Sequence, residues 1–386
     1  MEMIIDFPGG ARVDAHFGPY TVSTDQPPSG GGEASAPTPF AVFLSSIGTC
    51  AGIYVLGFCQ QRNLPTEGIE LTQRMEFDPV KRMISKVQLD IVVPPDKEEI
   101  LQGYEKQVRE RHIRHGFNAT VSGLENGDIT TGSLEDSDND GLWTSMYLAG
   151  QAFRYAVTQS EESFYNITES LNAMERLYTI NPVPGFPARS FERRGYKYGD
   201  KPWRRAEDPE WDWKSTTSSD EAIGHIFAFG VIAELIDHVE LKEKAIMLID
   251  TLMSHVVKNN FYLIDWNGEP TRWGRWNPEY VNARPVNVGD RKLNSSNIIA
   301  MLQTAYNFTG KEKYMDAVFY LMNEHGYLTN LMRPMDSIGM APPDADELSR
   351  ELSDLWNHSD DEMYYCGYWG LYRYALNDTL QKKFRE

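Results

Sequence analysis

The chain contains few cysteines, only three in 386 residues. An odd and small number excludes a fully paired disulfide framework and is typical of a reducing compartment. The sequence also lacks a phosphate-binding glycine loop, a G-x-G-x-x-G dinucleotide fingerprint and any Cys/His spacing typical of a zinc site. It therefore predicts no nucleotide, metal or other cofactor.

The chain is also poor in positive charge. It contains 37 Lys and Arg but 56 Asp and Glu, which gives a formal net charge of −19. Nucleic-acid phosphates and anionic lipids repel such a chain, so we expect neither nucleic acid nor membrane as a partner. The longest apolar run, residues 47–58, is interrupted by Gly and Thr and is too short to span a bilayer. No basic region precedes an apolar run at the N-terminus, so we expect a cytoplasmic protein.

The composition that remains, 41% hydrophobic and 24% charged, supports a large core. At roughly 100–200 residues per domain, this length predicts two domains, 1–96 and 97–386. The first has an α+β pattern, with strands within 4–17 and at 19–24, a Gly/Pro/Ser-rich loop at 26–39 and a hairpin of 69–77 with 83–93. Between loop and hairpin lies an apolar helix, 40–62, with Thr38 as its N-cap and Pro39 at its first position.

The second domain has an almost purely helical pattern. Helices are predicted at 97–114, 141–158, 160–178, 219–236, 241–258, 295–308, 311–325, 346–356 and 360–376. Pairs of them share a weak repeat, a helix end followed by a tight turn and a second helix. These short turns alternate with long loops of roughly thirty to forty residues, which are usually functional. Both features predict an all-α (α/α) toroid with the long loops on one rim.

Acids and imidazoles gather at the starts of helices that are apolar on nearly all sides. The candidate catalytic residues from this pattern are Asp140, Asp220, Glu221, His225, His358 and Asp361. If the inner helices of a toroid run parallel, these starts meet at one end, where carboxylates and imidazoles suit proton transfer. The alternative is helix capping, because Ser218 to Glu221 and Ser359 to Glu362 both match the capping box.

Two long loops before inner helices are rich in Trp and Arg. They provide the candidate substrate-binding residues Arg189, Trp213, Arg272, Trp273 and Trp276. Indoles offer flat apolar faces to sugar C–H groups, and guanidinium groups donate to hydroxyls or carboxylates. The alternative is that these indoles only pack the loops. The pattern favours a carbohydrate or another small polar substrate.

The N-terminal helix resembles one family. The residues that carry the resemblance are Thr38-Pro39-Phe40, Ile47-Gly48-Thr49-Cys50-Ala51-Gly52, Cys59 and Asn63-Leu64-Pro65, which look like the OsmC/Ohr family in its YhfA-like branch. The resemblance, over about residues 1–96, implies an α+β domain that dimerises by strand exchange and reduces organic hydroperoxides, with Cys50 as the peroxidatic cysteine. The family's second helical segment with its resolving cysteine does not follow residue 96.

Two alternatives for Cys50 remain open on the sequence. It is either a small buried residue in the middle of the apolar helix or a lone reactive thiol that needs an external reductant. Cys59 cannot pair with it, because nine residues of helix separate them by ~13.5 Å along the axis.

The helical half resembles a bacterial family of unassigned function. The resemblance rests on Asp138-Asn139-Asp140-Gly141-Leu142-Trp143-Thr144, Pro184-Gly185-Phe186-Pro187-Ala188-Arg189-Ser190, Thr217-Ser218-Ser219-Asp220-Glu221, Pro270-Thr271-Arg272-Trp273-Gly274 and Asn357-His358-Ser359-Asp360-Asp361-Glu362. More distantly, it is similar to six-hairpin toroid enzymes, which include glycoside hydrolases, polysaccharide lyases and sugar epimerases. The first hypothesis is therefore a carbohydrate-active enzyme in this half. The others are a thiol-dependent hydroperoxide reductase that uses Cys50 and a non-catalytic glycan-binding or scaffold protein.

Overall fold

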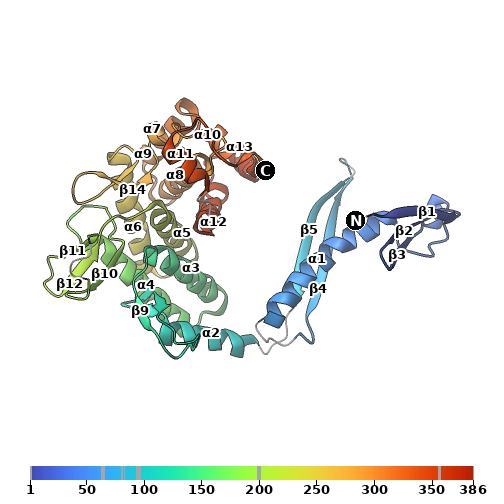
Figure 1. Cartoon of the computed structure of the whole chain (residues 1–386), viewed down its shortest axis with the longest axis horizontal. Helices are drawn as coiled ribbons and strands as arrows, with labels where there is room; N and C mark the ends of the chain where they lie inside the picture. Colours follow the sequence, from blue (N-terminus) through green and yellow to red (C-terminus); the bar gives the residue numbers. More distant parts are fainter. Residues whose placement is uncertain are drawn as a thin grey trace. The chain divides into compact units, whose positions relative to one another are not determined.

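The protein forms two compact units, Met1–Gln107 and Val108–Glu386, in a computed structural model of the whole chain (Figure 1). The structure describes residues 2–61, 66–79, 81, 83–92, 97–197, 201–354 and 358–385, without the side chains of 97–100 and 358. The boundary between the units falls inside helix α2 (Lys97–Arg111).

The first unit is α+β, as the sequence predicts. Strands β1 (Ile4–Gly9), β2 (Arg12–Phe17) and β3 (Tyr20–Thr24) form an antiparallel sheet in that order. A short 3-10 turn (Pro28–Gly30) precedes helix α1 (Pro39–Gln61). Strands β4 (Glu70–Asp78) and β5 (Met83–Val92) then form an antiparallel hairpin.

Helix α1 begins at the predicted cap. The Oγ1 of Thr38 accepts a hydrogen bond from the Ala41 N–H at 3.2 Å, which satisfies a donor of the first turn. Gly48 lets β4 approach this helix, because a Cβ there would lie 2.8 Å from Oε1 of Gln73. The Nε2 of Gln73 donates to the Leu44 carbonyl at 3.0 Å, so one polar side chain ties the hairpin to the helix.

Most of α1 is exposed, which the sequence did not predict. Phe43 and Tyr54 are 62% and 76% exposed. Cys50 is exposed as well, so the alternative of a buried Cys50 is wrong, whereas Cys59 is buried. By length and composition alone α1 is long and apolar enough to cross a membrane, so the apolar segment is longer than the run 47–58 identified in the sequence. The apolar segment is 23 residues long, because Gly and Thr do not interrupt the helix.

The second unit is built from helical hairpins. The pairs are α3 (Asp140–Thr158) with α4 (Glu161–Thr179), α5 (Ser219–Leu235) with α6 (Val239–Lys258), α8 (Gly289–Thr309) with α9 (Glu312–Phe319), and α12 (His358–Arg373) with α13 (Asp378–Arg385). A π turn (Tyr320–Glu324) continues α9. Gln159 and Gly310 end α3 and α8 in the left-handed conformation, which produces the tight turns of the repeat.

Helices α3, α5, α8 and α12 form an inner ring, and the partner of each packs outside it (Figure 1). Among these inner helices, α5 packs against α3, α8 and α12, and α8 packs against α12. Side chains also connect α12 with α3, where the rings of Trp369 and Phe153 lie 5.5 Å apart and the Cys366 sulfur lies 3.6 Å from that of Met146. An (α/α) toroid-like arrangement is thus confirmed, with four such hairpins among the described residues.

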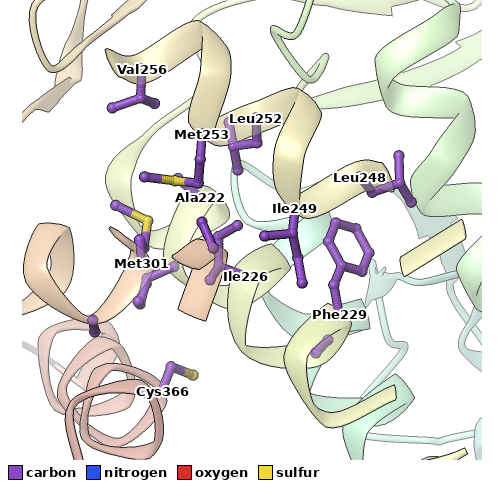
Figure 2. Packing of buried hydrophobic residues seen from close by; sticks show 14 of the residues in the cluster. Ala222, Ile226, Phe229, Leu248, Ile249, Leu252, Met253, Val256, Met301 and Cys366 are labelled. Atoms are coloured by element: carbon purple, nitrogen blue, oxygen red, sulfur yellow. The ribbon is translucent and has the colours of Figure 1, made fainter. Parts of the chain in front are cut away.

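The core lies between the inner ring and its outer layer. Figure 2 shows Ile226 and Phe229 of α5 against Ile249 and Met253 of α6, with Met301 of α8 beside them. None of these five side chains is more than 1% exposed. Because neighbouring helices cover it in this way, α5 can be apolar on every side.

The long loops contain strands, where the sequence predicts only loops and helices. Hairpins β6 (Ile113–Arg114) with β7 (Phe117–Asn118) and β8 (Thr120–Ser122) with β9 (Ser133–Glu135) precede α3. A three-stranded sheet of β10 (Ser190–Arg193), β12 (Trp211–Lys214) and β11 (Trp203–Arg205) precedes α5. The pair β13 (Tyr262–Ile264) and β14 (Pro270–Arg275) precedes α8.

Short helices complete the unit: α7 (Pro278–Val281), α10 (Tyr327–Leu331), α11 (Glu347–Asp354) and a 3-10 turn (Met335–Ser337). The predicted start of α8 at residue 295 is wrong, since the helix begins at Gly289. The polar run 294–297 suggests a cap, yet these side chains are buried. Ser295 and Ser296 donate instead to carbonyls one turn earlier, those of Arg291 and Lys292.

Candidate functional site in the helical unit

A cavity of about 320 Å³ lies where the four inner helices begin. Each helix start contributes side chains to its lining: Asn139 before α3, Ser219 and Asp220 of α5, Asp290 and Asn294 of α8, and Ser359 and Asp360 of α12. Four carboxylic acids therefore line one cavity: Asp220, Asp290 and Asp360 come from three different helices, and Asp138, which pairs with Lys214, precedes α3. The positive ends of the helix dipoles converge on the same place and favour negative charge there.

Trp273 of β14 borders the cavity. Its neighbour Arg272 stacks on the indole, with the guanidinium carbon 4.4 Å from the ring centroid, and pairs with Glu351 of α11 at 2.7 Å. Arg272 thus holds the indole by a cation–π contact, although it does not itself line the cavity. The flat face of a partly exposed indole is a surface on which a sugar ring can stack.

Asp290 is the acid with the most perturbed titration in the cavity. Burial raises its pKa from 3.8 to about 7, against the opposing effect of Arg284 and with a further contribution from the nearby Asp360. Its Oδ2 atom is buried and finds no hydrogen-bond partner in the described part of the chain. This carboxyl group can therefore hold a proton near neutral pH and can give it up.

Arg189 organises the side of the cavity where α3 and α5 begin. It donates to the carbonyls of Asp138 and Thr216, the latter at 3.0 Å, and to Ser218 Oγ at 3.2 Å. Its guanidinium thereby links the residues that precede both helices. Arg189 also lines the cavity, and its guanidinium group donates hydrogen bonds to the protein.

Thr216 is held in a conformation that β-branched residues rarely adopt, with φ of +69°. Its N–H donates to Asp265 at 2.9 Å and its carbonyl accepts from Arg189 at 3.0 Å. Such backbone strain costs about 1–3 kcal/mol, and these two hydrogen bonds hold Thr216 in this conformation. The strained residue lies just before α5, whose first residues Ser219 and Asp220 line the cavity.

Glu221 and His225 lie outside the cavity lining, buried between α5 and α3. Both are fully buried, and Glu221 Oε1 accepts from the Leu142 N–H at 3.4 Å. His225 shares a 2.7 Å hydrogen bond with the Tyr178 hydroxyl, and its Nε2 lies 3.7 Å from Glu221 Oε2. Burial raises the pKa of Glu221 well above 4.5 and lowers that of His225 to about 3, because it disfavours the charged form of each group.

The capping box predicted for α5 does not form. Ser218 makes no side-chain cap hydrogen bond, and its Oγ accepts from Arg189 instead. The carboxyl group of Glu221 points to α3, not to its own helix start. Gly141 makes this contact possible, because a Cβ there would lie 2.0 Å from Glu221 Oε2.

Asp140 is also absent from the cavity. It is fully buried, pairs with Arg114 at 2.8 Å and accepts from Ser190 Oγ at 2.7 Å. Burial raises its pKa despite the opposing charge of Arg114. These contacts anchor the start of α3 to β6 and β10.

Three further candidates lie elsewhere. Asp361 lines a separate cavity, whereas the residue before it, Asp360, lines the cavity that contains Asp220 and Asp290. Trp213 and Trp276 are 1% and 0% exposed, so the prediction that they contact a ligand is corrected: the sheet of β12 and the segment after β14 bury them in the core. The side chain of His358 lies outside the described residues.

The structure therefore brings together Asp220, Arg189 and Trp273 from the predicted set, and it adds Asp290 and Asp360. The sequence contained a signal for Asp290, an acid that follows Gly289 in a first helical turn. The polar residues 294–297 resemble a helix cap, and for this reason the sequence predicted a helix start at residue 295. Within the described ranges, no group of three His, Cys, Asp or Glu residues is arranged to hold a metal ion.

Residues 30–111 match the family model described as OsmC-like protein, which confirms the resemblance of the N-terminal half and carries it through α2. One similar solved structure is described as an osmotic stress induced and detoxification response protein from Psychrobacter arcticus. It is 20% identical over 26% of this chain and 78% of that one, with a TM-score of 0.21.

A second similar structure is a family 76 glycoside hydrolase from a bovine Bacteroides thetaiotaomicron strain. It is 11% identical over 83% of this chain and 63% of that one, with a TM-score of 0.44. A search of curated proteins found no match.

Proposed function

We propose that the helical unit is a carbohydrate-active enzyme of the glycoside hydrolase type. The observation that carries this proposal is the meeting of Asp220, Asp290 and Asp360 in one cavity that Trp273 borders. Carboxylic acids at different helix starts can give and accept protons on opposite sides of a bond, and the indole offers a stacking face to the sugar.

Asp290 is assigned as the general acid. With its pKa raised to about 7, it is largely protonated below neutral pH and can donate to the glycosidic oxygen as the C–O bond breaks. Asp220 or Asp360 then supplies the carboxylate that activates water or attacks the anomeric carbon. In either case water adds to the sugar and Asp290 recovers its proton.

The test is hydrolysis of an oligosaccharide panel by the full chain and by Asp290→Asn. We expect turnover by the wild type, a loss of at least ~10²-fold in kcat in the variant, and wild-type activity that declines above about pH 7. The matched control is Glu161→Gln, an exposed acid in the first turn of the outer helix α4.

Two outcomes of this test contradict the proposal. Equal activity of Asp290→Asn and wild type excludes Asp290 as the general acid. Saturable binding of a glycan without any turnover supports the non-catalytic glycan-binding hypothesis instead.

A second function is favoured by the exposure of Cys50. This residue lies within the range that matches the OsmC-like model, and the preceding Thr49 lines a groove of about 490 Å³ between α1 and β4. A thiolate there can attack a hydroperoxide, so that the O–O bond breaks and an alcohol and a cysteine sulfenic acid form. Because Cys59 and Cys366 are buried, an external dithiol must reduce the sulfenic acid.

This second function predicts that Cys50→Ser loses dithiol-dependent consumption of an organic hydroperoxide, whereas Thr49→Ser keeps it. Trapping of the sulfenic acid with dimedone and mass spectrometry locates the reactive sulfur. Hydroperoxide consumption that survives in Cys50→Ser contradicts it.

For the N-terminal unit we propose a homodimer. The support is the exposed apolar surface of α1, which includes Phe40, Phe43, Ile53, Tyr54 and Phe58. Apolar patches of this kind usually mark an interaction surface, and a second copy brings an equal patch of its own.

A further inference from the structure

A second, larger cavity of about 690 Å³ lies in the helical unit between α8, α12, α13 and the segment that follows α10. Its walls are mainly apolar and aromatic, and they include Leu331, Met335, Tyr364, Tyr365, Tyr368 and Phe384. Cavities of this size with apolar walls are typical of sites for small organic ligands.

Three cations line the same cavity: Lys292 of α8, Arg333 after α10 and Lys383 of α13. None of them forms an ion pair with a carboxylate among the described residues. In the lining they stand against one acid, Asp361. In a chain with a net charge of −19, such a group of cations is unusual.

Lys292 is the most enclosed of the three. Its ammonium group donates to the Leu331 carbonyl at 2.5 Å and lies 5.8 Å from the centroid of the Tyr364 ring. Burial lowers its pKa, which means that the charged form lacks full compensation in the free protein. A negative charge placed in the cavity would supply that compensation.

We propose that this cavity binds a single-chain organic anion, a carboxylate of the fatty-acid type. Its carboxylate lies among Lys292, Arg333 and Lys383, and its chain follows the wall of Leu331, Met335 and the tyrosines. Two methionines, Met332 and Met335, line the wall, and such flexible side chains adapt to an alkyl chain.

The site is distinct from the cavity of Asp220, Asp290 and Asp360, although α8 and α12 contribute to both. On α8, Asp290 lines the acidic cavity and Lys292 lines the apolar one. On α12, Asp360 lines the acidic cavity and Asp361 lines the apolar one. Binding of the anion therefore does not depend on hydrolysis in the first cavity.

The test uses dodecanoate below its micelle concentration, titrated into the full-length protein by calorimetry. Arg333→Glu/Lys383→Glu is compared with Arg350→Glu/Lys382→Glu, which makes the same charge change at exposed residues outside the cavity. We expect dodecanoate to bind at least about 10-fold more weakly to the first double variant and within about two-fold of wild type to the control. Dodecanol should bind more weakly than dodecanoate to the wild type.

Location is tested with a diazirine derivative of dodecanoate and mass spectrometry, because the exposed α1 also offers an apolar surface. We expect labelled peptides from 331–335 and 364–368. Labels confined to α1 and the β4–β5 hairpin overturn the proposal, as does an equal loss of affinity in both double variants. Binding to phosphatidylglycerol vesicles but not to monomeric dodecanoate also overturns it, because the ligand is then a lipid surface.

Discussion

At the scale of single residues, burial sets the acidities in the helical unit more than charge partners do. Burial is the largest influence on Asp290, Glu221 and Asp140, and it raises the pKa of each. The three acids nevertheless differ in what surrounds them, because only Asp290 lines the cavity. A ligand in the cavity can therefore exchange a proton with Asp290, whereas Glu221 and Asp140 are enclosed by the packing around α3 and α5.

The raised pKa of Asp290 predicts a pH-dependent gain of stability in Asp290→Asn. The pKa of Asp290 is near 3.8 in the unfolded chain and about 7 in the folded protein. At a pH between these two values, the folded state therefore binds the proton more tightly than the unfolded state. Wild-type stability therefore falls relative to the variant as pH rises through this window, and the difference is constant above it. Because the side chain is only partly buried, we expect a difference of about 2 kcal/mol at pH 8.

Urea unfolding between pH 4 and pH 8 measures this difference. Asp344→Asn removes an exposed acid and is the control, for which we expect no such trend. A difference between Asp290→Asn and wild type that does not change with pH contradicts the prediction.

Gly141 provides a second prediction at this scale. In Gly141→Ala the new Cβ would lie 2.0 Å from Glu221 Oε2 and 2.5 Å from His225 Nε2, so α3 must move away from α5. We expect a loss of about 2–3 kcal/mol in the free energy of unfolding, as for other overpacked cores. Gly150→Ala, in the same helix with open space around it, should instead gain a few tenths to about 1 kcal/mol. Equal effects of the two substitutions in chemical unfolding would refute this account.

At the scale of elements, the geometry of the site depends on how the segments before the inner helices are fastened. Arg114 of β6 binds Asp140 at the start of α3, and it also donates to Ser190 Oγ and to the Phe191 carbonyl of β10. Arg189, just before β10, reaches the residues that precede α3 and α5. Two buried arginines thus connect short strands to helix starts.

We predict that Arg114→Met destabilises the helical unit by about 3 kcal/mol or more, because it leaves the buried Asp140 carboxylate without its partner. In the double variant Arg114→Met/Asp140→Asn, the loss should be clearly smaller than the sum of the two single losses. A double-mutant cycle by urea unfolding measures this coupling. Glu210→Gln, in an exposed pair with Arg193, is the control and should change stability by less than about 1 kcal/mol. Additive losses in the cycle would mean that Arg114 and Asp140 act independently.

At the scale of the whole molecule, the two units differ in how completely they bury their apolar side chains. The helical unit has a continuous core that runs through the inner ring and its outer helices. In the N-terminal unit, by contrast, Phe43, Tyr54 and Phe77 remain more than half exposed. The first unit therefore has the stronger need for a partner, which is the reason for the proposed homodimer.

We expect the full-length protein to be a dimer at micromolar concentration in light scattering coupled to size exclusion. Phe43→Glu/Tyr54→Glu should give a monomer, because it places charges on the exposed face of α1. Val157→Glu changes an 85% exposed apolar residue of α3 and should leave the dimer intact. A wild-type protein that is monomeric at every concentration contradicts the proposed homodimer.

The sequence by itself determined the two classes of architecture and most of the helices. Periodicity and turn chemistry are local, so Thr38 as the cap of α1 and the hairpin α3–α4 follow from a few neighbouring residues. The all-round apolar character of α5 likewise predicts an inner helix before any contact is known.

Only the tertiary structure decided which acids meet. Consecutive residues on a helix point about 100° apart, so the choice between Asp220 and Glu221, or between Asp360 and Asp361, depends on the rotation of each helix in the ring. The start of α8 at Gly289 depends on distant contacts as well, since Asn330 binds the buried Ser295. The burial of Trp213 depends on a sheet whose strands β10 and β12 are separated by a long loop. Helix rotation, buried polar contacts and strand pairing join residues far apart in the chain, and local patterns do not specify them.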